Sequence, residues 1–347
     1  MKLDEVRVAV VGAGRMGTDH INRINERVSG ATVSAIVEPD SARGKAALAQ
    51  ATNAQILASL DEAIAAQSLD AVLIATPGQF HEPVILTALA ARLPILCEKP
   101  LTQEPESSRR VLEAEQKLGR PHIQVGFMRR FDREYSQLRD LVLSKAAGDL
   151  LMLHCVHRNP HVPEGYDQDM LITDSVVHEF DVAPWLAGSD VKSVEVKFPR
   201  RNSLSPARLR EPILVLIELT NGVLVDVEMN VSIQFGYQAT TEAVFEQGAA
   251  SIGHTGGLLQ WQDERAFRHE HSSFTTRFAD SFDREVQRWV DAIRRGTLVD
   301  GPTAWEGYKV ALACEAGVKA LNEGGIVEIP FEERPEMYAQ EISPQAN

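Results

Sequence analysis

Short apolar runs alternate with segments of helical periodicity over the first 127 residues. An apolar run of this length, bounded by turn residues, is typical of a strand buried on both faces of a parallel sheet. The alternation predicts an α/β domain with a doubly wound parallel sheet and helices on both faces. The predicted strands are Val6–Val11, Thr32–Val37, Ala71–Ala75, Ile95–Cys97 and Ile123–Gly126, and the predicted helices are Arg15–Val28, Ser41–Gln50, Leu60–Ala66, Pro83–Ala91 and Glu104–Leu118.

The pattern changes after residue 127. Predicted strands between residues 191 and 270 follow one another without helices, and Asn221-Gly222 is a strong hairpin signal between two of them. This predicts a second, α+β domain with an open-faced, mostly antiparallel sheet. We expect domains at residues 1–127 and 128–335 and a polar tail at 336–347, with packing of the last helices on the first domain left open. The predicted helices are Phe131–Lys145, Ile172–Gly188, Phe278–Arg295 and Thr303–Asn322, and the predicted strands are Asp149–His157, Val191–Phe198, Ile213–Thr220, Val223–Val231, Thr241–Gln247 and Leu258–Gln262.

Composition and charge narrow the class of protein. The 347 residues are 44% hydrophobic and 24% charged, which is ordinary for a globular protein. A formal net charge of −14 argues against binding to nucleic acid or to an anionic membrane surface. No apolar run approaches a membrane span, no signal-peptide pattern opens the chain, and the three cysteines form no C-x-x-C pair. We therefore expect a cytoplasmic protein with reduced thiols.

The turn after the first predicted strand carries Gly12, Gly14 and Gly17 in the spacing G-x-G-x-x-G. The first glycine allows a tight turn, the second lets a phosphate approach the backbone, and the third lets the next helix pack against the strand. That helix begins at Arg15 and Met16, so its free N–H groups would face a pyrophosphate. The motif predicts a dinucleotide site, with an ordinary strand–turn–helix as the alternative.

Glu38 follows the second predicted strand, close to the interval of about 20 residues expected for an acid that binds ribose. Its carboxylate would accept hydrogen bonds from the two ribose hydroxyls, and it would repel a 2′-phosphate. The sequence therefore predicts NAD rather than NADP as the cofactor.

Two further polar groups follow strands of the first domain, at the sheet edge where ligands bind in this class of fold. Thr76, Pro77 and His81 follow the third predicted strand, and Glu98 and Lys99 follow the fourth. Since the residue before a proline is held extended, the Lys99 side chain has a defined direction. We predict that these residues bind the cofactor and that Lys99 acts in the site, with a solvated loop lysine as the alternative.

A polar stripe runs along the predicted helix Ile172–Gly188. At 100° per residue, one face of this otherwise apolar helix carries Asp174, His178, Asp181 and Trp185. A solvated face would carry lysine or glutamate, so the stripe predicts a functional group of side chains. A capping aspartate beside a buried structural histidine is the alternative.

These motifs together resemble the Gfo/Idh/MocA oxidoreductase family, and within it the inositol 2-dehydrogenases. The resemblance covers about residues 6–330 and rests on VAVVGAGRMG, CEKP, QVGFMRRFD, HRNP and TDSVVHEFD. It implies a Rossmann domain that binds NAD, a C-terminal domain with an open-faced sheet, and commonly a homotetramer assembled through that sheet. The loop Thr76-Pro77-Gly78 departs from the commoner family form, which has Asn after the Pro, so we assign no cofactor contact to Gly78.

The resemblance also implies a reaction and roles for individual residues. Lys99, Asp174 and His178 would carry the chemistry. The implied reaction is NAD-dependent oxidation of a secondary alcohol of a cyclic polyol, inositol in its myo or scyllo form, to the keto-inositol. An NAD(P)-dependent aldose dehydrogenase of the same family stays open. The residues implied to line the polyol pocket are Met128, Arg129, His157, Asn159, Asp181 and Tyr237.

The residue types suit this reaction, in which a proton leaves oxygen and a hydride leaves carbon. Histidine is a common general base, so His178 would take the proton. Asp174, one turn earlier, would orient the imidazole and stabilise its charged form. Lys99 would hydrogen-bond the reacting oxygen and favour its developing negative charge.

Two other classes of function fit less well. A metal-dependent enzyme is disfavoured because HEFDV at His178 lacks the second histidine of H-E-x-x-H, and no cysteine or histidine pair nearby has zinc-site spacing. A non-enzymatic NAD-binding sensor is disfavoured because it would not need Lys99 and Asp174 in addition to His178. We expect no metal, no nucleic-acid partner and no membrane partner, and a homo-oligomer whose size, dimer or tetramer, stays open. The histidines considered for a metal site are His154, His157, His161 and His178.

Overall fold

The computed structural model describes residues 4–339 except 52, 67, 255 and 257. The chain divides into two compact units, and each is described by itself. Unit 1 comprises Met1–Met128, Phe282–Ala311 and Glu333–Asn347, and unit 2 comprises Arg129–Ser281 and Leu312–Glu332. The second predicted domain, 128–335, therefore differs from unit 2 chiefly in Phe282–Ala311, which belongs to unit 1.

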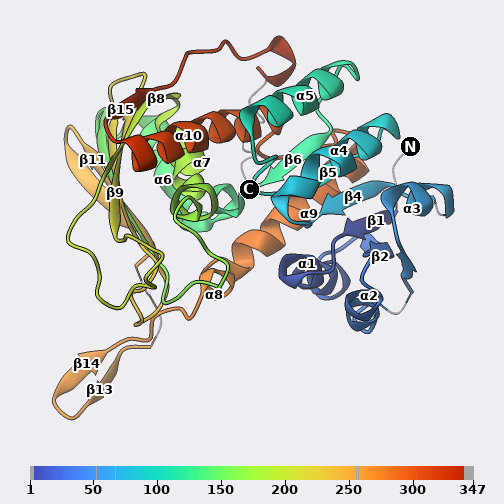
Figure 1. Ribbon diagram of the computed structural model, residues 1–347, viewed down its shortest axis with the longest axis horizontal. Helices are drawn as coiled ribbons and strands as arrows, with labels where there is room; N and C mark the ends of the chain where they lie inside the picture. Colours follow the sequence, from blue (N-terminus) through green and yellow to red (C-terminus); the bar gives the residue numbers. More distant parts are fainter. Residues whose placement is uncertain (1–3, 52, 67, 255, 257, 340–347) are drawn as a thin grey trace. The chain divides into compact units, whose positions relative to one another are not determined.

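Unit 1 contains a six-stranded sheet in the order β3-β2-β1-β4-β5-β6, in which every strand pair is parallel (Figure 1). The predicted parallel α/β fold is confirmed, and the strand order reverses between β1 and β4, where such folds bind ligands. The three-residue edge strand β3 is the one strand of this sheet that the sequence pattern did not predict. The strands are β1 (Val6–Val11), β2 (Ala31–Val37), β3 (Gln55–Leu57), β4 (Ala71–Ile74), β5 (Ile95–Glu98) and β6 (Ile123–Gly126), and the helices are α1 (Arg15–Glu26), α2 (Ser41–Leu48), α3 (Leu60–Ala66), α4 (His81–Ala90) and α5 (Pro105–Gln116).

The core of unit 1 explains why residues far along the chain belong to it. Val8 of β1 and Ile36 of β2 are fully buried and lie in one apolar cluster with Ile24 of α1. Helix α9 (Ala279–Arg295) adds Trp289, which is also fully buried, to the same cluster. An apolar face of α9 therefore completes a core that begins with the first strand.

Unit 2 contains a seven-stranded sheet in the order β12-β11-β7-β10-β9-β8-β15. Its strand pairs are antiparallel except for β7 with β10, so the prediction of a mostly antiparallel sheet is confirmed. The predicted Asn221-Gly222 turn joins β9 to β10, and Gly222 has a φ of +88°. The strands are β7 (Leu150–Arg158), β8 (Val191–Lys197), β9 (Ile213–Leu219), β10 (Leu224–Asn230), β11 (Gln238–Phe245), β12 (Gly248–Ile252) and β15 (Ile326–Glu328), and the helices are α6 (Arg133–Ser144), α7 (Val177–Ala187), α8 (Phe274–Arg277) and the later part of α10 (Ala304–Glu323).

One face of the unit 2 sheet is covered and the other is open. Along β9, residues alternate between buried and half-buried, as expected for a strand with one solvated face. A separate hairpin of β13 (Gln260–Gln262) and β14 (Arg265–Phe267) extends away from this sheet (Figure 1). It presents Trp261, which is 73% exposed.

Two segments differ in detail from the predicted pattern. The predicted helix Ile172–Gly188 begins with a π-helical turn, Leu171–Val176, before α7. The predicted polar tail contains a short 3₁₀ helix, Glu336–Tyr338, in which the Tyr338 side chain is buried, while residues 340–347 lie outside the described residues. Among the described residues, no helix combines the length and the apolar character needed to cross a membrane.

Candidate active site

The glycine turn after β1 has the geometry of a dinucleotide site. Gly12 has a φ of +92°, and a Cβ there would lie 2.9 Å from backbone atoms of Ala75. A Cβ on Gly17 would lie 1.9 Å from the Gly12 carbonyl oxygen, so only glycine lets α1 come this close. A Cβ on Gly14 would meet nothing within 4 Å. The turn therefore leaves space beside Gly14 for a ligand to approach the backbone.

Arg15 and Met16 form the start of α1, directly after its N-cap residue Gly14. Arg15 is exposed and Met16 is half-buried. The N-cap has no side chain that accepts from the helix, and no acidic residue lies in the first turn. The backbone N–H groups at this end of α1 are therefore suited to a phosphate.

Glu38 follows β2 and contacts the glycine turn. Its carboxylate accepts hydrogen bonds from the Ala13 N–H at 3.0 Å and the Asp40 N–H at 2.9 Å, and the Arg43 guanidinium donates to it at 3.2 Å. Burial raises the pKa of Glu38, but these three donors outweigh burial and hold the pKa below its usual value. The carboxylate is thus charged and fixed beside the turn, where a ribose-binding acid is expected.

His81 bridges the loops that follow β4 and β5. Its Nε2 lies 2.7 Å from the Thr76 carbonyl oxygen, and its Nδ1 lies 2.7 Å from the Pro100 carbonyl oxygen. The His81 residue is only 1% exposed, whereas Pro77, in the same loop as Thr76, is exposed. The structure therefore joins the two predicted cofactor loops through His81, whose ring contacts the protein backbone.

Glu98 ends β5, and its carboxylate is buried beside Lys99. Its Oε2 accepts a hydrogen bond from the Lys99 backbone N–H at 3.2 Å, and its Oε1 lies 2.7 Å from His20 Nε2. Burial raises the pKa of Glu98, but the interactions with His20 and then with Lys99 outweigh burial and lower the pKa. Lys99 itself is half-buried and begins the loop at the carboxyl end of β5.

In unit 2, the segment that carries Asp174 and His178 changes helix type between them. Asp174 lies in the π-helical turn and is exposed, whereas His178 lies in α7 and is 8% exposed. Single π-helical turns are rare and occur frequently at functional sites. The ring centroid of His178 lies 6.1 Å from that of His157 on β7, so the structure brings these two predicted histidines together.

A buried charged cluster adjoins this pair of histidines. The guanidinium of Arg129 forms an ion pair with Glu179, and its Nη2 lies 3.2 Å from His157 Nδ1. The Tyr237 hydroxyl lies 3.4 Å from His157 Nε2, on the other side of the ring. Burial raises the pKa of Glu179, but Arg129 and His157 outweigh it and lower the pKa. Burial raises the pKa of Tyr237 to about 12.

The second half of the predicted polar stripe engages arginines. Arg130 Nη2 donates to Asp181 Oδ1 at 2.6 Å, and the Asp181 residue is 2% exposed. The Trp185 ring centroid lies 5.8 Å from the Arg130 guanidinium carbon and 4.4 Å from that of Arg139. The stripe is therefore divided: Asp181 and Trp185 form ion-pair and cation–π contacts, whereas His178 lies near His157.

The remaining predicted site residues lie at element ends. Asn159 follows β7, is half-buried, and its backbone N–H donates to the Asn230 carbonyl at 2.8 Å. Met128 is the last residue of the first segment of unit 1 and is 2% exposed. His154, considered above for a metal site, lies 2.5 Å from Asp226 across the β7–β10 pair. In the part of the chain that the structure describes, no group of three or more His, Cys, Asp or Glu side chains could hold a metal ion.

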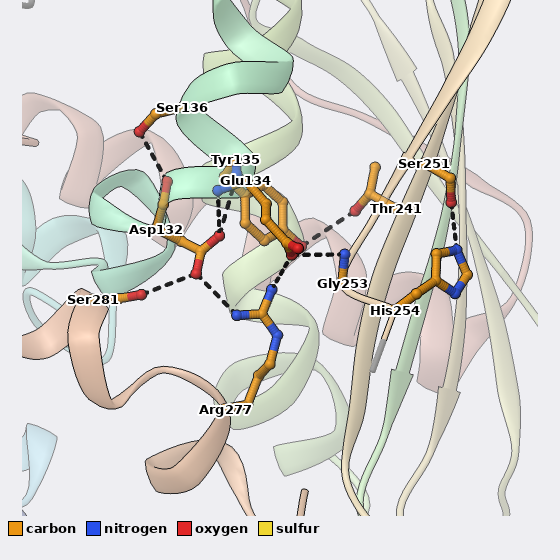
Figure 2. Close-up of polar contacts among 10 residues, drawn as sticks. All are labelled: Asp132, Glu134, Tyr135, Ser136, Thr241, Ser251, Gly253, His254, Arg277 and Ser281. Carbon is orange, nitrogen blue, oxygen red and sulfur yellow. Dashed lines mark hydrogen bonds and ion pairs between the residues drawn. The ribbon is translucent and has the colours of Figure 1, made fainter. Parts of the chain in front are cut away.

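Figure 2 shows the ion pairs that hold the segment before α9 onto α6. The Arg277 guanidinium donates to Asp132 Oδ2 at 2.9 Å and to Glu134 Oε2 at 2.9 Å. The next residue, Phe278, lies with its ring centroid 5.6 Å from the Arg129 guanidinium carbon. These ion pairs therefore position an aromatic ring against the buried charged cluster of Arg129 and Glu179.

Several residues with a direct part in these contacts were not predicted from the sequence, among them His20, Arg130 and Glu179. His20 follows Gly17 by three residues and so shares its buried helix face, where a polar side chain was an available signal. Glu179 is an acid among apolar neighbours on α7, which was a similar signal. Neither pattern indicates which partner the side chain has, because the partners lie on other elements.

Comparisons with known proteins agree with this geometry. A family model described as "Oxidoreductase family, NAD-binding Rossmann fold" matches residues 6–127, and one of the GFO/IDH/MocA C-terminal domain matches residues 135–251. The chain is 64% identical over 334 residues to an inositol 2-dehydrogenase of Corynebacterium glutamicum, which covers 96% of this chain and 99% of the relative. It is 65% identical over 335 residues to an inositol 2-dehydrogenase of Leifsonia xyli subsp. xyli, with coverages of 96% and 98%.

A solved structure extends the similarity to the whole fold. The myo-inositol dehydrogenase from Lactobacillus casei, crystallised in complex with NAD(H) and myo-inositol, matches with a TM-score of 0.94 at 29% sequence identity. The match covers 96% of this chain and 99% of that chain.

Proposed function

The chain belongs to the Gfo/Idh/MocA oxidoreductase family, and on that premise we propose that it oxidises inositol, in its myo or scyllo form, to the keto-inositol. It is a dehydrogenase, and its cofactor is NAD. The observation that carries the choice of substrate is the 64% identity to an inositol 2-dehydrogenase across 96% of the chain.

The residues of unit 1 fit NAD. The open space beside Gly14 and the uncapped start of α1 suit a pyrophosphate, and the charged Glu38 suits two ribose hydroxyls. A 2′-phosphate would meet the Glu38 carboxylate, which supports a preference for NAD over NADP. When bound, NAD accepts the hydride that leaves the alcohol carbon.

Three side chains act on the alcohol oxygen in this proposal. His178 takes the hydroxyl proton as general base, a task for which imidazole is well suited. Asp174 orients that imidazole and stabilises its charged form, and its position in a π-helical turn supports a functional role. Lys99 donates a hydrogen bond to the oxygen and stabilises its developing negative charge.

The polyol pocket in this proposal combines contact residues and supporting residues. His157, Asn159 and Tyr237 offer polar groups that suit the hydroxyls of a polyol, and Met128 offers an apolar surface. Arg129 and Asp181 already form ion pairs, with Glu179 and Arg130 respectively, so we assign them to shaping the pocket.

We also propose a cytoplasmic homotetramer assembled through the open face of the unit 2 sheet. An isolated two-stranded hairpin is marginally stable by itself. Trp261 in the β13–β14 hairpin is 73% exposed, and Leu258, just before this hairpin, is 78% exposed. Contact with a second copy of the chain would cover these side chains. Light scattering at micromolar concentration tests the assembly, and a stable monomer would contradict it.

A substrate panel tests the proposed reaction. Purified protein is assayed for NADH formation with myo-inositol, scyllo-inositol and a set of aldoses, each with NAD and with NADP. We expect an inositol with NAD to give the highest kcat/KM. Faster turnover of an aldose would favour a sugar dehydrogenase of the same family, and NAD binding without turnover of any substrate would favour a sensor.

A further inference from the structure

We propose that His20, on α1, is a positioning residue for Lys99 and acts through the carboxylate of Glu98. All of these residues belong to unit 1. The inference rests on the proposed role of Lys99 at the reacting oxygen. Helix α1 would then have two roles. Its start would bind the pyrophosphate, and His20, further along the helix, would help to position Lys99 for the reaction.

The two carboxylate oxygens of Glu98 contact different residues. Oε1 lies 2.7 Å from His20 Nε2, and Oε2 accepts from the Lys99 backbone N–H at 3.2 Å. A Cβ on Gly126, in the neighbouring strand, would lie 3.1 Å from Glu98 Oε2, so the glycine leaves room for the carboxylate. The carboxylate therefore links the side chain of His20 to the backbone of Lys99 in one buried arrangement.

Arg23 determines which nitrogen of His20 carries the hydrogen. Its Nη1 lies 3.1 Å from His20 Nδ1. A guanidinium only donates hydrogen bonds, so Nδ1 must accept. Nε2, the atom that faces Glu98, then carries a hydrogen and donates it to the carboxylate.

Arg23 is itself held in one orientation by two acids. Its Nε donates to Asp283 at 2.7 Å and its Nη2 donates to Asp19 at 2.8 Å. The Phe282 ring packs edge-on against the His20 ring, with 6.1 Å between centroids, and the His20 residue is 1% exposed. The contacts with Arg23 and Phe282 therefore favour the ring orientation in which Nε2 faces Glu98.

The consequence for Lys99 follows from the burial of Glu98. Burial raises the pKa of Glu98, and the largest opposing contribution is the hydrogen bond from His20. Without that donor, the carboxylate must protonate or turn toward another donor, because an unpaired charge is costly in the protein interior. Either change alters the contact with Lys99 and the direction in which its chain leaves β5.

A matched set of variants tests this inference. His20→Leu should lower kcat about 10²-fold, since displacement of a catalytic group by about 1 Å has an effect of that size. His20→Gln should recover most of the activity, because its amide can donate to Glu98. His122→Gln is the control: His122 is a buried histidine of unit 1 that contacts the Arg120 carbonyl, and kcat should barely change. The dissociation constant for NAD, from fluorescence titration, should change less than threefold in every variant.

A double variant that combines His20→Leu with Lys99→Met tests whether His20 positions Lys99 or only supports the fold. Residues that act as one unit are not additive, so adding His20→Leu to Lys99→Met should lower kcat by less than twofold. A multiplicative loss would overturn the inference, as would normal kcat in His20→Leu. Glu98→Gln keeps the side-chain shape and should give the same loss and the same non-additivity, so the test holds if His20→Leu does not fold. If Lys99→Met alone leaves kcat unchanged, the proposed role of Lys99 is wrong, which is a different result from additivity.

Discussion

The two units hold their candidate site residues in different ways. In unit 1, backbone groups do most of the holding: the Ala13 and Asp40 N–H groups fix Glu38, and two carbonyl oxygens hold the His81 ring. In unit 2, side chains hold side chains: Arg129 pairs with Glu179, 50 residues away, and Tyr237 contacts His157, 80 residues away. The backbone groups that hold side chains in unit 1 lie in turns that the sequence marks with local motifs. In unit 2, the contacts depend instead on charged side chains that are buried together in pairs.

This difference has an energetic consequence. When a side chain held by backbone groups is changed, its hydrogen bonds are lost but no buried charged partner is left behind. A buried ion pair that loses one partner leaves an uncompensated charge, which is strongly destabilising. Mutations in unit 1 should therefore alter ligand preference, and mutations in the unit 2 cluster should alter stability together with activity. His20 and Glu98 are an exception among the site residues of unit 1, because their side chains contact each other directly.

The largest expected effect is the loss of the proposed base in unit 2. His178→Ala should lower kcat about 10²–10⁴-fold, the usual contribution of a positioned acid–base group. The dissociation constant for NAD should barely change, because the glycine turn and Glu38 belong to unit 1. His154→Ala is the matched control, since His154 is a partly exposed histidine paired with Asp226. Normal turnover in the His178 variant, with folding intact, would mean that another group is the base.

The second effect tests whether the buried cluster is needed for stability. Glu179→Gln should lower the free energy of unfolding by about 3–5 kcal/mol, because Arg129 would be left buried without its carboxylate. Urea unfolding followed by circular dichroism measures the change. Asp70→Asn weakens the ion pair of Asp70 with the half-exposed Arg7 in unit 1. This variant should change the free energy of unfolding only a little. Equal shifts for both variants would remove the proposed contrast between the units.

The third effect concerns cofactor preference. Glu38→Ser should reduce the ratio of kcat/KM with NAD to that with NADP about 100-fold, since it removes a ribose acceptor and a repulsive charge. Arg43, which lies 3.2 Å from Glu38, would then be available to a 2′-phosphate. Adding Arg43→Gln should reverse the gain with NADP. A wild-type protein that uses both cofactors equally well would contradict the role assigned to Glu38.

The smallest effect is a pH dependence in unit 1. Glu115 accepts from the N–H groups of His122 and Ile123 and contacts the Tyr338 hydroxyl, and burial raises its pKa from 4.5 to about 7. Between pH 5 and pH 7 the folded protein therefore binds more protons at this group than the unfolded chain does, so its contribution to stability falls as pH rises.

Glu115→Gln removes this titration. The stability of the wild type relative to the variant should fall by about 2 kcal/mol between pH 5 and pH 7, measured by urea unfolding at both values. Glu113→Gln, at an exposed position of the same helix, is the control. The same pH dependence in the wild type and in Glu115→Gln would show that Glu115 does not titrate in this range.

The parallel sheet of unit 1 could be predicted almost residue by residue. Each strand except β3 agrees with its predicted range to within one residue at each end, because an apolar run bounded by turn residues is a local signal. The glycine spacing, the acid after β2 and Lys99 before a proline are local signals of the same kind. They identify which loops meet at one edge of a parallel sheet without any knowledge of its packing.

The partners of buried charged side chains were decided only by the tertiary structure. The pattern of α7 indicated a polar stripe, but not that Asp181 pairs with Arg130 or that Asp174 lies in a π-helical turn that precedes α7. Helix α9 begins in unit 2, yet from Phe282 onward it belongs to unit 1, because Trp289 completes a core begun by β1. Periodicity and turn chemistry act over a few residues, whereas a buried charge takes its partner from whichever element packing brings into contact.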